Sequence, residues 1–375
     1  MSKKTKIFLI SNTSNFFNVF MLNHIKVLSK KYNLFICSEN SKKLKKKVPK
    51  NVSLININFK RGISFYEDII SFFSIFFIFL KHRPDLSISF TPKVGLIVSI
   101  SSFITRIPNR YHWFTGQIWA NSKGFKRTFY KFTDKLIFIL SNHVFVDGIS
   151  QKDFLLKEKI IKKKKSTVFH KGSICGVNIS KFSLKKQNRI KLRKHYLIDN
   201  NTFIFLYLGR INKDKGIIEL INAFNKIYSA HKVLLILVGS LEDLKLTELI
   251  KNNKKIKYFN FTNKPEKWYS LADILCLPSH REGFGNVVIE AASCGIPSLC
   301  SNIYGLKDAI INKKTGFFHK VGNTSDIKKK MLYVIRNKKL VKKYGISAKK
   351  RAIRDFEQSL ITKKFLKFIN LNISK

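Results

Sequence analysis

The fold is decided by the stretch ILCLPSHREGFGNVVIEAASCGIPSLCS, residues 274–301. It begins with an apolar run at 274–279 that is long enough for a buried strand, and it ends with a second run at 297–301. Between the two runs, Gly283 and Gly285 open a segment with the spacing of a helix. A strand, a helix and a strand in this order form the unit of a parallel sheet covered by helices. The stretch therefore predicts an α/β fold.

The same alternation extends over the rest of the chain. Towards the N-terminus we expect strands at 6–11, 33–38, 52–57, 86–90, 110–114 and 143–147, and helices at 17–30, 66–81, 94–105 and 125–140. Further strands are expected at 203–209, 233–239 and 256–260, with a helix at 217–227. The pattern predicts two doubly wound, Rossmann-like sheets that bind ligands at the carboxyl ends of their strands, in a central cleft that both sheets face.

A chain of 375 residues is long enough for two domains of similar size. We expect the first Rossmann-like domain at 1–170 and the second at 171–355, which begins at a Gly-containing stretch. A C-terminal helix at 356–375 is expected to pack back on the first domain.

The charge balance is extreme, because 72 Lys and Arg against 22 Asp and Glu leave a net charge of +50. Such a surface attracts phosphates, anionic lipid or nucleic acid. The alternative explanation is a genome rich in A and T, whose codons favour Lys, Asn, Ile and Phe. A non-catalytic nucleic-acid-binding protein is the rival function that the charge suggests. No recognised binding motif accompanies the charge, so we expect no specific nucleic-acid partner.

The cysteine pattern indicates a reducing compartment. The five cysteines form no CxxC pair, and we expect no disulfide partner for them. The apolar residues Ile7 to Ile10 are too few for the core of a signal peptide. We therefore expect the chain in the cytoplasm.

The longest apolar run, Ile69 to Leu80, is shorter than the roughly 20 residues that span a bilayer. It has two interpretations. One is a helix of the protein core. The other is a helix that dips into a lipid interface, because Lys81, His82 and Arg83 follow its Phe-rich sequence.

Two glutamates flank the helix of the central stretch. Glu282 and Glu290 lie eight positions apart, which corresponds to roughly 12 Å if the segment is mostly helical. This is about the reach from the sugar to the ribose of a nucleotide-sugar. Carboxylates accept paired hydrogen bonds from hydroxyls, so we expect Glu290 to bind the ribose and Glu282 to bind the sugar.

The start of that helix is the predicted diphosphate site. Gly285 lies at the turn, and the first free N–H groups are expected at Asn286, Val287 and Val288. A helix N-terminus carries partial positive charge and binds phosphate groups without a metal.

A second loop adds two cations at the end of another strand. In YLGRINKDKG, residues 207–216, the strand ends at Gly209, and Arg210 and Lys215 follow. Two cations on one short loop suit a diphosphate leaving group, which gains negative charge in the transition state. No Asp-x-Asp occurs in the chain, so we expect these cations to take the place of a metal. We expect no metal and no other cofactor.

These motifs resemble those of the retaining GT-B glycosyltransferases of family 4, which include enzymes of bacterial O-antigen, capsule and lipid-linked oligosaccharide synthesis. The EX7E motif of that family falls on Glu282 and Glu290, and its phosphate-binding pair falls on Arg210 and Lys215. The stretch YHWFTGQIWA, residues 111–120, is similar to a motif of transferases that work on polyprenyl-linked sugars, and the likeness implies that His112 lies under the donor sugar. A hydrogen bond to a hydroxyl or a share of positive charge are its two possible roles. The turn GSICGVN has Asn178 where the family usually has Asp.

The resemblance implies a function. It is the transfer of a hexose or N-acetylhexosamine from a UDP-sugar bound mainly in the C-terminal domain, with retention of configuration. The acceptor is a polyprenyl-diphosphate-linked or other membrane-held glycan, bound mainly in the N-terminal domain. The partners implied are therefore a UDP-sugar, a lipid-linked glycan and an anionic membrane surface, with the protein peripheral on the inner face of the cell membrane. A GT-B epimerase of UDP-sugars is the alternative within the same fold.

Overall fold

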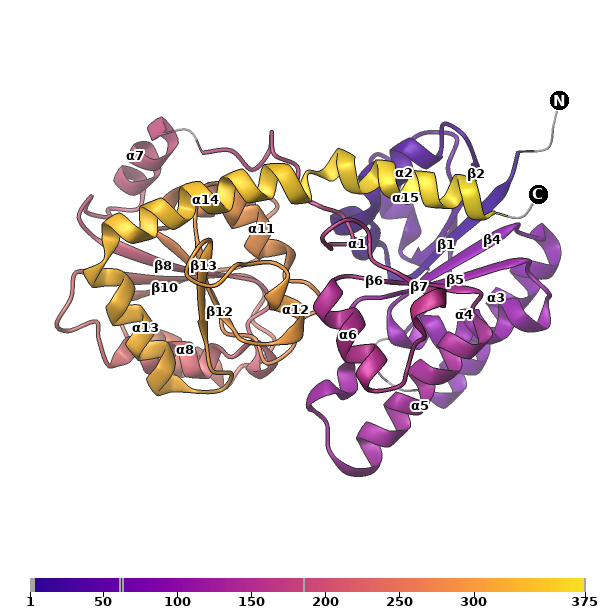
Figure 1. Ribbon diagram of the computed structural model, residues 1–375, viewed down its shortest axis with the longest axis horizontal. Helices are drawn as coiled ribbons and strands as arrows, with labels where there is room; N and C mark the ends of the chain where they lie inside the picture. Colours follow the sequence, from indigo (N-terminus) through magenta and orange to yellow (C-terminus); the bar gives the residue numbers. More distant parts are fainter. Residues whose placement is uncertain (1–3, 61, 63, 185, 374–375) are drawn as a thin grey trace. The chain divides into compact units, whose positions relative to one another are not determined.

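The computed structural model describes residues 4–60, 62, 64–184 and 186–373. The chain folds into two compact units, which we describe separately (Figure 1). The N-terminal unit consists of residues 1–175 and 358–375, and the C-terminal unit consists of residues 176–357. Each unit contains one parallel sheet with helices packed on it.

The N-terminal unit is built on a seven-stranded sheet in the order β3-β2-β1-β4-β5-β6-β7. All neighbouring strands are parallel. The strands are β1 (Lys6–Thr13), β2 (Asn33–Glu39), β3 (Ser53–Asn56), β4 (Leu86–Phe90), β5 (Asn109–Phe114), β6 (His143–Val146) and β7 (Ser166–Thr167). Six of them lie at predicted positions, whereas β7 was not predicted because two residues carry no periodicity.

Alternate residues of β1 pack into two different hydrophobic cores. Ile7 and Leu9 face the core that includes α2 (Leu22–Leu28) and α15 (Gln358–Asn372), and these two helices contact each other. Phe8 and Ile10 face the core beneath α3 (Phe65–His82) and α4 (Pro92–Ile104). The helix α5 (Gly124–Leu140) packs beside α4 on that same side. This two-sided covering makes the sheet doubly wound.

The C-terminal unit contains six parallel strands in the order β10-β9-β8-β11-β12-β13. They are β8 (Phe203–Leu208), β9 (Val233–Val238), β10 (Ile256–Phe259), β11 (Ile274–Leu277), β12 (Ser298–Ser301) and β13 (Gly316–His319). The strand β13 was not predicted, because its four residues follow a polar, Lys-containing turn. The helices α8 (Ile217–Asn225) and α11 (Asn286–Ser293) follow β8 and β11. The helix α14 (Lys338–Phe356) packs against α11.

The chain enters and leaves the C-terminal unit at adjacent positions. Val177 donates its N–H to the carbonyl of Phe356 at 2.7 Å, and it bridges Glu357. The next residue, Asn178, accepts a hydrogen bond from the N–H of Lys181 at 3.0 Å. The asparagine side chain therefore caps this turn, as an aspartate does.

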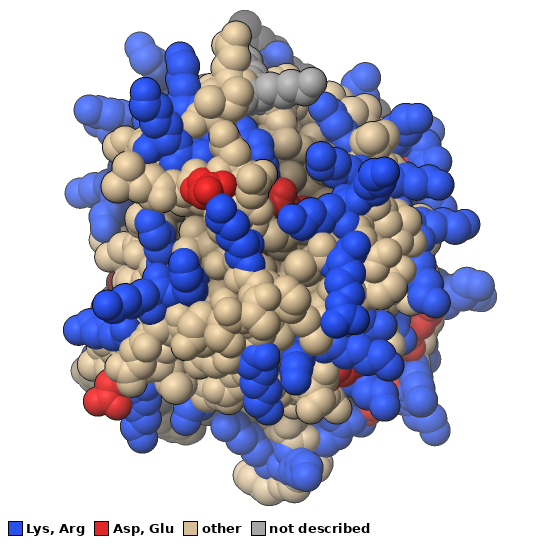
Figure 2. Space-filling model, turned by 90° about the vertical axis from the view of Figure 1, so that its left-hand side faces the viewer, with Lys and Arg blue, Asp and Glu red and all other residues tan. Residues whose placement is uncertain are grey.

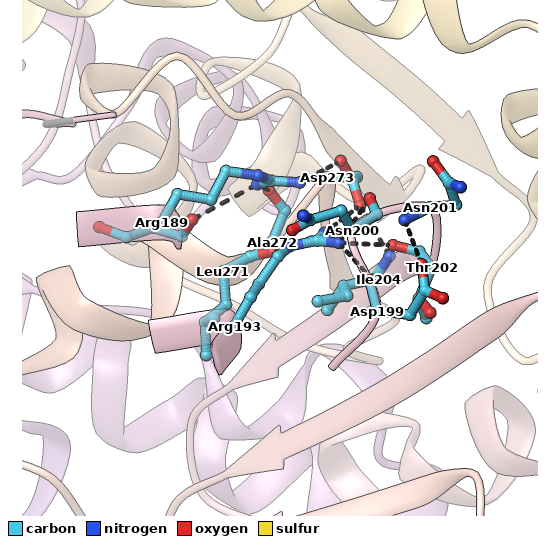
Figure 3. A network of polar contacts seen from close by, with 11 residues as sticks. Arg189, Arg193, Asp199, Asn200, Asn201, Thr202, Ile204, Leu271, Ala272 and Asp273 are labelled. Carbon is cyan, nitrogen blue, oxygen red and sulfur yellow. Dashed lines mark hydrogen bonds and ion pairs between the residues drawn. The ribbon is translucent and has the colours of Figure 1, made fainter. Parts of the chain in front are cut away.

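A polar network fastens α7 (Lys186–His195) to the beginnings of β8 and β11 (Figure 3). Arg193 is 2% exposed, and it donates to the carbonyls of Asp199, Asn200 and Thr202. Its guanidinium also pairs with Asp273, which binds Arg189 through its other oxygen at 2.7 Å. One buried cation therefore satisfies three carbonyl groups of the loop that leads into β8.

Positive charge is spread over one face of the molecule. On the face drawn in Figure 2, Lys and Arg side chains are distributed over the whole outline, and acidic side chains are few. None of the helices in the described ranges is long and apolar enough to cross a membrane.

Candidate functional site

An ion pair between Lys215 and Glu282 lies at the carboxyl ends of two neighbouring strands of the C-terminal unit. Lys215 follows β8 and Glu282 follows β11, and these strands are hydrogen-bonded partners. Lys215 Nζ lies 2.6 Å from Glu282 Oε1, and the two side chains are 15% and 16% exposed. The hydroxyl of Ser279 donates to the same carboxylate oxygen at 2.8 Å. The structure thus brings together two residues predicted from separate motifs.

The loop that carries Lys215 has a defined shape. Lys215 ends a short 3-10 turn, η5 (Lys213–Lys215), and the side chain of Asn212 accepts its backbone N–H at 3.2 Å. Gly216 follows with a φ of 68°, and a Cβ atom there would lie 2.1 Å from the carbonyl oxygen of Pro278. Glycine is therefore required for this loop to pack against the end of β11.

Arg210 lies on the same loop, immediately after Gly209, but its environment differs. Its guanidinium pairs with Glu242 at 3.2 Å and is 55% exposed. Asn212 donates to the same Glu242 oxygen at 2.8 Å. The backbone carbonyl of Arg210 accepts the hydroxyl of Tyr207 at 2.6 Å. The side chain thus points towards solvent, where it is available to an anionic ligand.

The predicted helix after Gly285 is α11, and the N–H of Val288 in its first turn does not match the expectation. Gly285 has a φ of 72° and is the N-cap. The N–H of Val288 donates to the carbonyl of Gly285 at 2.9 Å, which leaves it unavailable to a ligand. The prediction that Val288 offers a free donor beside Asn286 and Val287 is therefore wrong. The reason is that the first turn is tight. The N–H of Val288 bonds the carbonyl three residues earlier, whereas an ideal α-helix leaves this N–H without a partner in the helix.

Glu290 is partly exposed and is bonded by an aromatic residue. The hydroxyl of Tyr269, in α10 (Pro265–Leu271), donates to Glu290 Oε2 at 2.8 Å. Burial raises the pKa of Glu290 to about 7, although the Tyr269 hydrogen bond opposes the shift. Of the residues from Glu282 to Glu290, only those from Asn286 onward are helical. The estimate of roughly 12 Å between Glu282 and Glu290 assumed a mostly helical segment. This assumption holds only from Asn286 onward.

His112 lies in the N-terminal unit, on β5, and is 1% exposed. Its Nδ1 is 2.8 Å from the hydroxyl of Ser89, and its ring contacts that of Phe114. Burial lowers the pKa of His112 to about 3, so the imidazole is neutral at pH 7. A neutral ring retains its hydrogen-bonding role but contributes no positive charge.

Comparison with known proteins supports one interpretation of these motifs. Residues 188–351 match the family described as Glycosyl transferases group 1. The chain is 31% identical over 366 residues to the capsular polysaccharide biosynthesis glycosyltransferase CapM of Staphylococcus aureus, and the match covers 96% of this chain and 95% of that protein.

The chain belongs to the group 1 glycosyltransferases.

Two further comparisons place this glycosyltransferase in context. It is 24% identical over 267 residues to the UDP-Gal:alpha-D-GlcNAc-diphosphoundecaprenol alpha-1,3-galactosyltransferase of Escherichia coli, with 68% of each chain covered. The crystal structure of HepE from Anabaena in complex with UDP and glucose has a TM-score of 0.80 and 16% identity. It covers 98% of this chain and 99% of that one. These findings confirm the predicted GT-B fold, and the family decides against a non-catalytic nucleic-acid-binding protein.

Several polar residues of the glycosyltransferase site were not predicted. Ser279 and Asn212 position Glu282 and Lys215, and Tyr269 positions Glu290. The sequence contains a signal for Ser279, because a serine three residues before a glutamate at a strand end is close enough to bond it. No comparable signal exists for Tyr269, which is 21 positions from Glu290.

The site also contains an imidazole and carboxylate pair. His280 Nε2 lies 2.9 Å from Glu219 Oε1, between β11 and α8. No group of three or more His, Cys, Asp or Glu residues suited to hold a metal ion occurs among the residues that the structure describes.

Proposed function

We propose that this glycosyltransferase moves a hexose or N-acetylhexosamine from a UDP-sugar to a polyprenyl-diphosphate-linked or other membrane-held glycan, with retention of configuration, in the synthesis of a cell-surface polysaccharide. The observation that carries the proposal is the Lys215 and Glu282 pair at the carboxyl ends of β8 and β11. The printed names of two relatives support it. One is a capsular polysaccharide enzyme, and the other uses UDP-Gal and a diphosphoundecaprenol-linked sugar.

The proposed donor position follows from the charges of the C-terminal unit. The diphosphate would lie between the start of α11 and the loop of Arg210 and Lys215, where a helix N-terminus and two cations favour negative charge. Glu282 would accept hydrogen bonds from hydroxyls of the sugar, and Glu290 would accept them from the ribose. His112 is proposed to bond a donor-sugar hydroxyl as a neutral imidazole.

The reaction would exchange one bond for another. A bond forms between the anomeric carbon and the acceptor oxygen, and the bond from that carbon to the diphosphate oxygen breaks. The departing diphosphate takes the proton of the acceptor hydroxyl. Lys215 and Arg210 would stabilise the negative charge that develops on the diphosphate, which is the role that metal ions have in other transferases. We propose that no metal is required.

We propose that the protein acts in the cytoplasm, peripherally on the inner face of the cell membrane, where a lipid-linked acceptor is held. The high net charge of +50 supports attraction to anionic lipid.

A transfer assay tests the proposed reaction. Purified protein is incubated with radiolabelled UDP-glucose, UDP-galactose or UDP-N-acetylglucosamine and with a lipid extract of the source membranes, in excess EDTA. We expect label from one of the donors to enter the lipid phase. Added Mn²⁺ should change the rate of this transfer by less than about twofold. Loss of transfer in EDTA with recovery in Mn²⁺ contradicts the metal-independent mechanism. Conversion of the free UDP-sugar without any lipid indicates an epimerase.

Donor binding is expected to depend on pH through Glu290. Its raised pKa of about 7 means that the carboxylate, which accepts hydrogen bonds from hydroxyls, is replaced by the acid as the pH falls. The Kd for UDP-glucose should therefore rise about tenfold between pH 8 and pH 6, since the ionised fraction falls by about that factor. Isothermal titration calorimetry measures it, and UDP-glucose is suitable because both of its phosphates stay ionised in this range.

Two variants separate this effect from other titrations. Glu290→Gln should bind UDP-glucose weakly and with a flat pH profile. Tyr269→Phe removes the hydrogen bond that lowers the pKa of Glu290, so it should move the midpoint to higher pH. A wild-type Kd that is constant from pH 6 to pH 8 would remove Glu290 from the ribose site.

A further inference from the structure

The exposed apolar side chains of this protein are concentrated on three helices. Of the twenty-six large hydrophobic residues that are exposed in the described part of the chain, seven lie on α3, two on α4 and four on α5. We call these thirteen residues the apolar face. They are Phe65, Tyr66, Ile69, Ile70, Phe73, Phe77, Leu80, Phe103, Ile104, Phe125, Phe129, Phe132 and Ile139.

The apolar face lies on one side of one sheet. The helix α4 packs between α3 and α5, and the three helices lie side by side (Figure 1). In α3 the residues Ser71, Ile75 and Phe79 are buried towards the sheet. Phe73 and Phe77 are 49% and 61% exposed. The helix α3 thus combines the two interpretations that its sequence left open, since one of its sides belongs to the core and the other is exposed.

The opposite side of the same sheet shows how unusual this is. On that side, the helices are α2 and α15, with a turn before α2. Within the described ranges, their exposed large apolar residues are Val19 and Leu371. A buried hydrophobic core lies beneath the helices on each side of the sheet, so both sets of helices are packed against it. Thirteen exposed large apolar residues on three neighbouring helices indicate an interaction surface.

The charges of the three helices favour an anionic partner. Their carboxylates are all engaged, because Glu67 pairs with Lys60, Asp68 pairs with Lys93 and Asp134 is buried against the indole of Trp119. Exposed cations lie at the ends of these helices and beside them, with no ion pair recorded in the described part of the chain. They are Lys81, Arg83, Arg106, Lys123 and Lys126. An apolar surface bordered by unpaired cations is complementary to anionic headgroups above acyl chains.

We infer that the apolar face of α3, α4 and α5 docks on the surface of a bilayer that contains anionic phospholipid. The aromatic side chains enter the interface, and the bordering cations contact the headgroups. This inference deepens the proposed function and rests on it for the choice of a membrane rather than another partner. The inference also says which aromatic residues of α3 contact lipid. They are Phe73 and Phe77, which are exposed, and not Phe72 and Phe76, which are only partly exposed.

Vesicle co-sedimentation tests the inference. The full chain is mixed with vesicles of phosphatidylcholine alone or with one quarter phosphatidylglycerol. Wild type should bind the anionic vesicles at 0.1 M NaCl and less at 0.5 M. Phe73→Ser combined with Phe77→Ser should lower the partition coefficient at least about tenfold, because two aromatic side chains no longer enter the interface. The matched control is Val19→Ser combined with Leu371→Ser on the opposite side of the sheet, which should bind as wild type does.

Two further measurements test whether the variants are folded and whether the apolar face contacts lipid. Thermal unfolding should be the same for both double variants, since all four substituted side chains are exposed. Phe77→Trp should show fluorescence quenching by brominated lipid, because the native Trp residues, Trp113, Trp119 and Trp268, are buried. Equal vesicle binding by wild type and the Phe variant overturns the inference and assigns binding to diffuse charge. Dimers in sedimentation velocity that the same substitutions dissociate also overturn it.

The outcome is separable from that of the proposed function. Slow hydrolysis of UDP-sugar by water should be unchanged in the Phe73 and Phe77 variant, because the C-terminal unit is intact. A Lys215 variant should lose hydrolysis but pellet with vesicles as wild type does. Vesicle binding without any sugar transfer would support the inference that the apolar face docks on a bilayer, and it would contradict the proposed enzymatic function.

Discussion

Replacing Lys215 by alanine is expected to lower kcat/KM for sugar transfer by roughly 30-fold to 1,000-fold, which corresponds to about 2 to 4 kcal/mol of lost transition-state stabilisation. The side chain is 15% exposed and ends 2.6 Å from Glu282, so its charge acts in a partly water-excluded position. The substitution removes the cation nearest to the proposed diphosphate. Glu282 keeps the hydrogen bond from Ser279 but loses its cation partner. Steady-state kinetics at saturating acceptor measure the effect.

Lys213 supplies the matched control for this experiment. It lies on the same 3-10 turn, two residues before Lys215, and it is exposed, with no ion pair recorded in the described ranges. Lys213→Ala removes the same charge from the loop but should change kcat/KM by less than about twofold. Equal losses in the two variants would attribute the effect to the overall charge of the loop. Unchanged turnover of the Lys215 variant at saturating donor would contradict the assignment of Lys215.

Replacing Arg193 by methionine is expected to destabilise the C-terminal unit by about 3 to 5 kcal/mol. The side chain is 2% exposed, and it donates hydrogen bonds to three loop carbonyls (Figure 3). Methionine fills a similar volume but donates nothing, so all three carbonyls lose this donor, and that of Asp199 keeps the N–H of Thr202 at 3.0 Å. Asp273 keeps its pair with Arg189. Urea unfolding followed by circular dichroism gives the change in the free energy of unfolding.

Arg189 provides the comparison, because it binds the same carboxylate from one turn earlier in α7 but is 31% exposed. Arg189→Met should cost about 1 kcal/mol or less, since exposed ion pairs contribute little. Arg193→Lys should lie between the two, because an ammonium group does not reproduce the fork of five donors. A similar loss for Arg189→Met and Arg193→Met would show that burial does not decide the contribution of this network.

Most of the strands could be predicted from periodicity alone, whereas several helices, among them α7, α10 and α14, were not predicted. The strands and helices of the first 150 residues and the strand, helix and strand of the central stretch lie within a few residues of their predicted positions. Buried parallel strands are continuous apolar runs, and helices have apolar residues every three to four positions, so both leave a local signal. The strands β7 and β13 leave none, because they have two and four residues.

The candidate site was predictable where a motif is local. Glu282, Lys215 and Gly285 lie in short segments whose residue types suggest a chemistry, and the fold brings the first two together. Their partners are different. Tyr269 and Glu242 bind Glu290 and Arg210 from other elements, and no spacing in the sequence predicts such contacts. Only the packed structure shows them.

By itself the sequence determined the α/β class, the two sheets and the residue types offered to a diphosphate, because these depend on local periodicity and on neighbours in the chain. The tertiary structure decided which of those residues are accessible and in which charge state. It buried His112 and lowered its pKa, raised the pKa of Glu290, paired the N–H of Val288 and exposed Phe73 and Phe77. Burial and protonation depend on atoms that are distant in sequence and close in space, so they are determined only when the chain has folded.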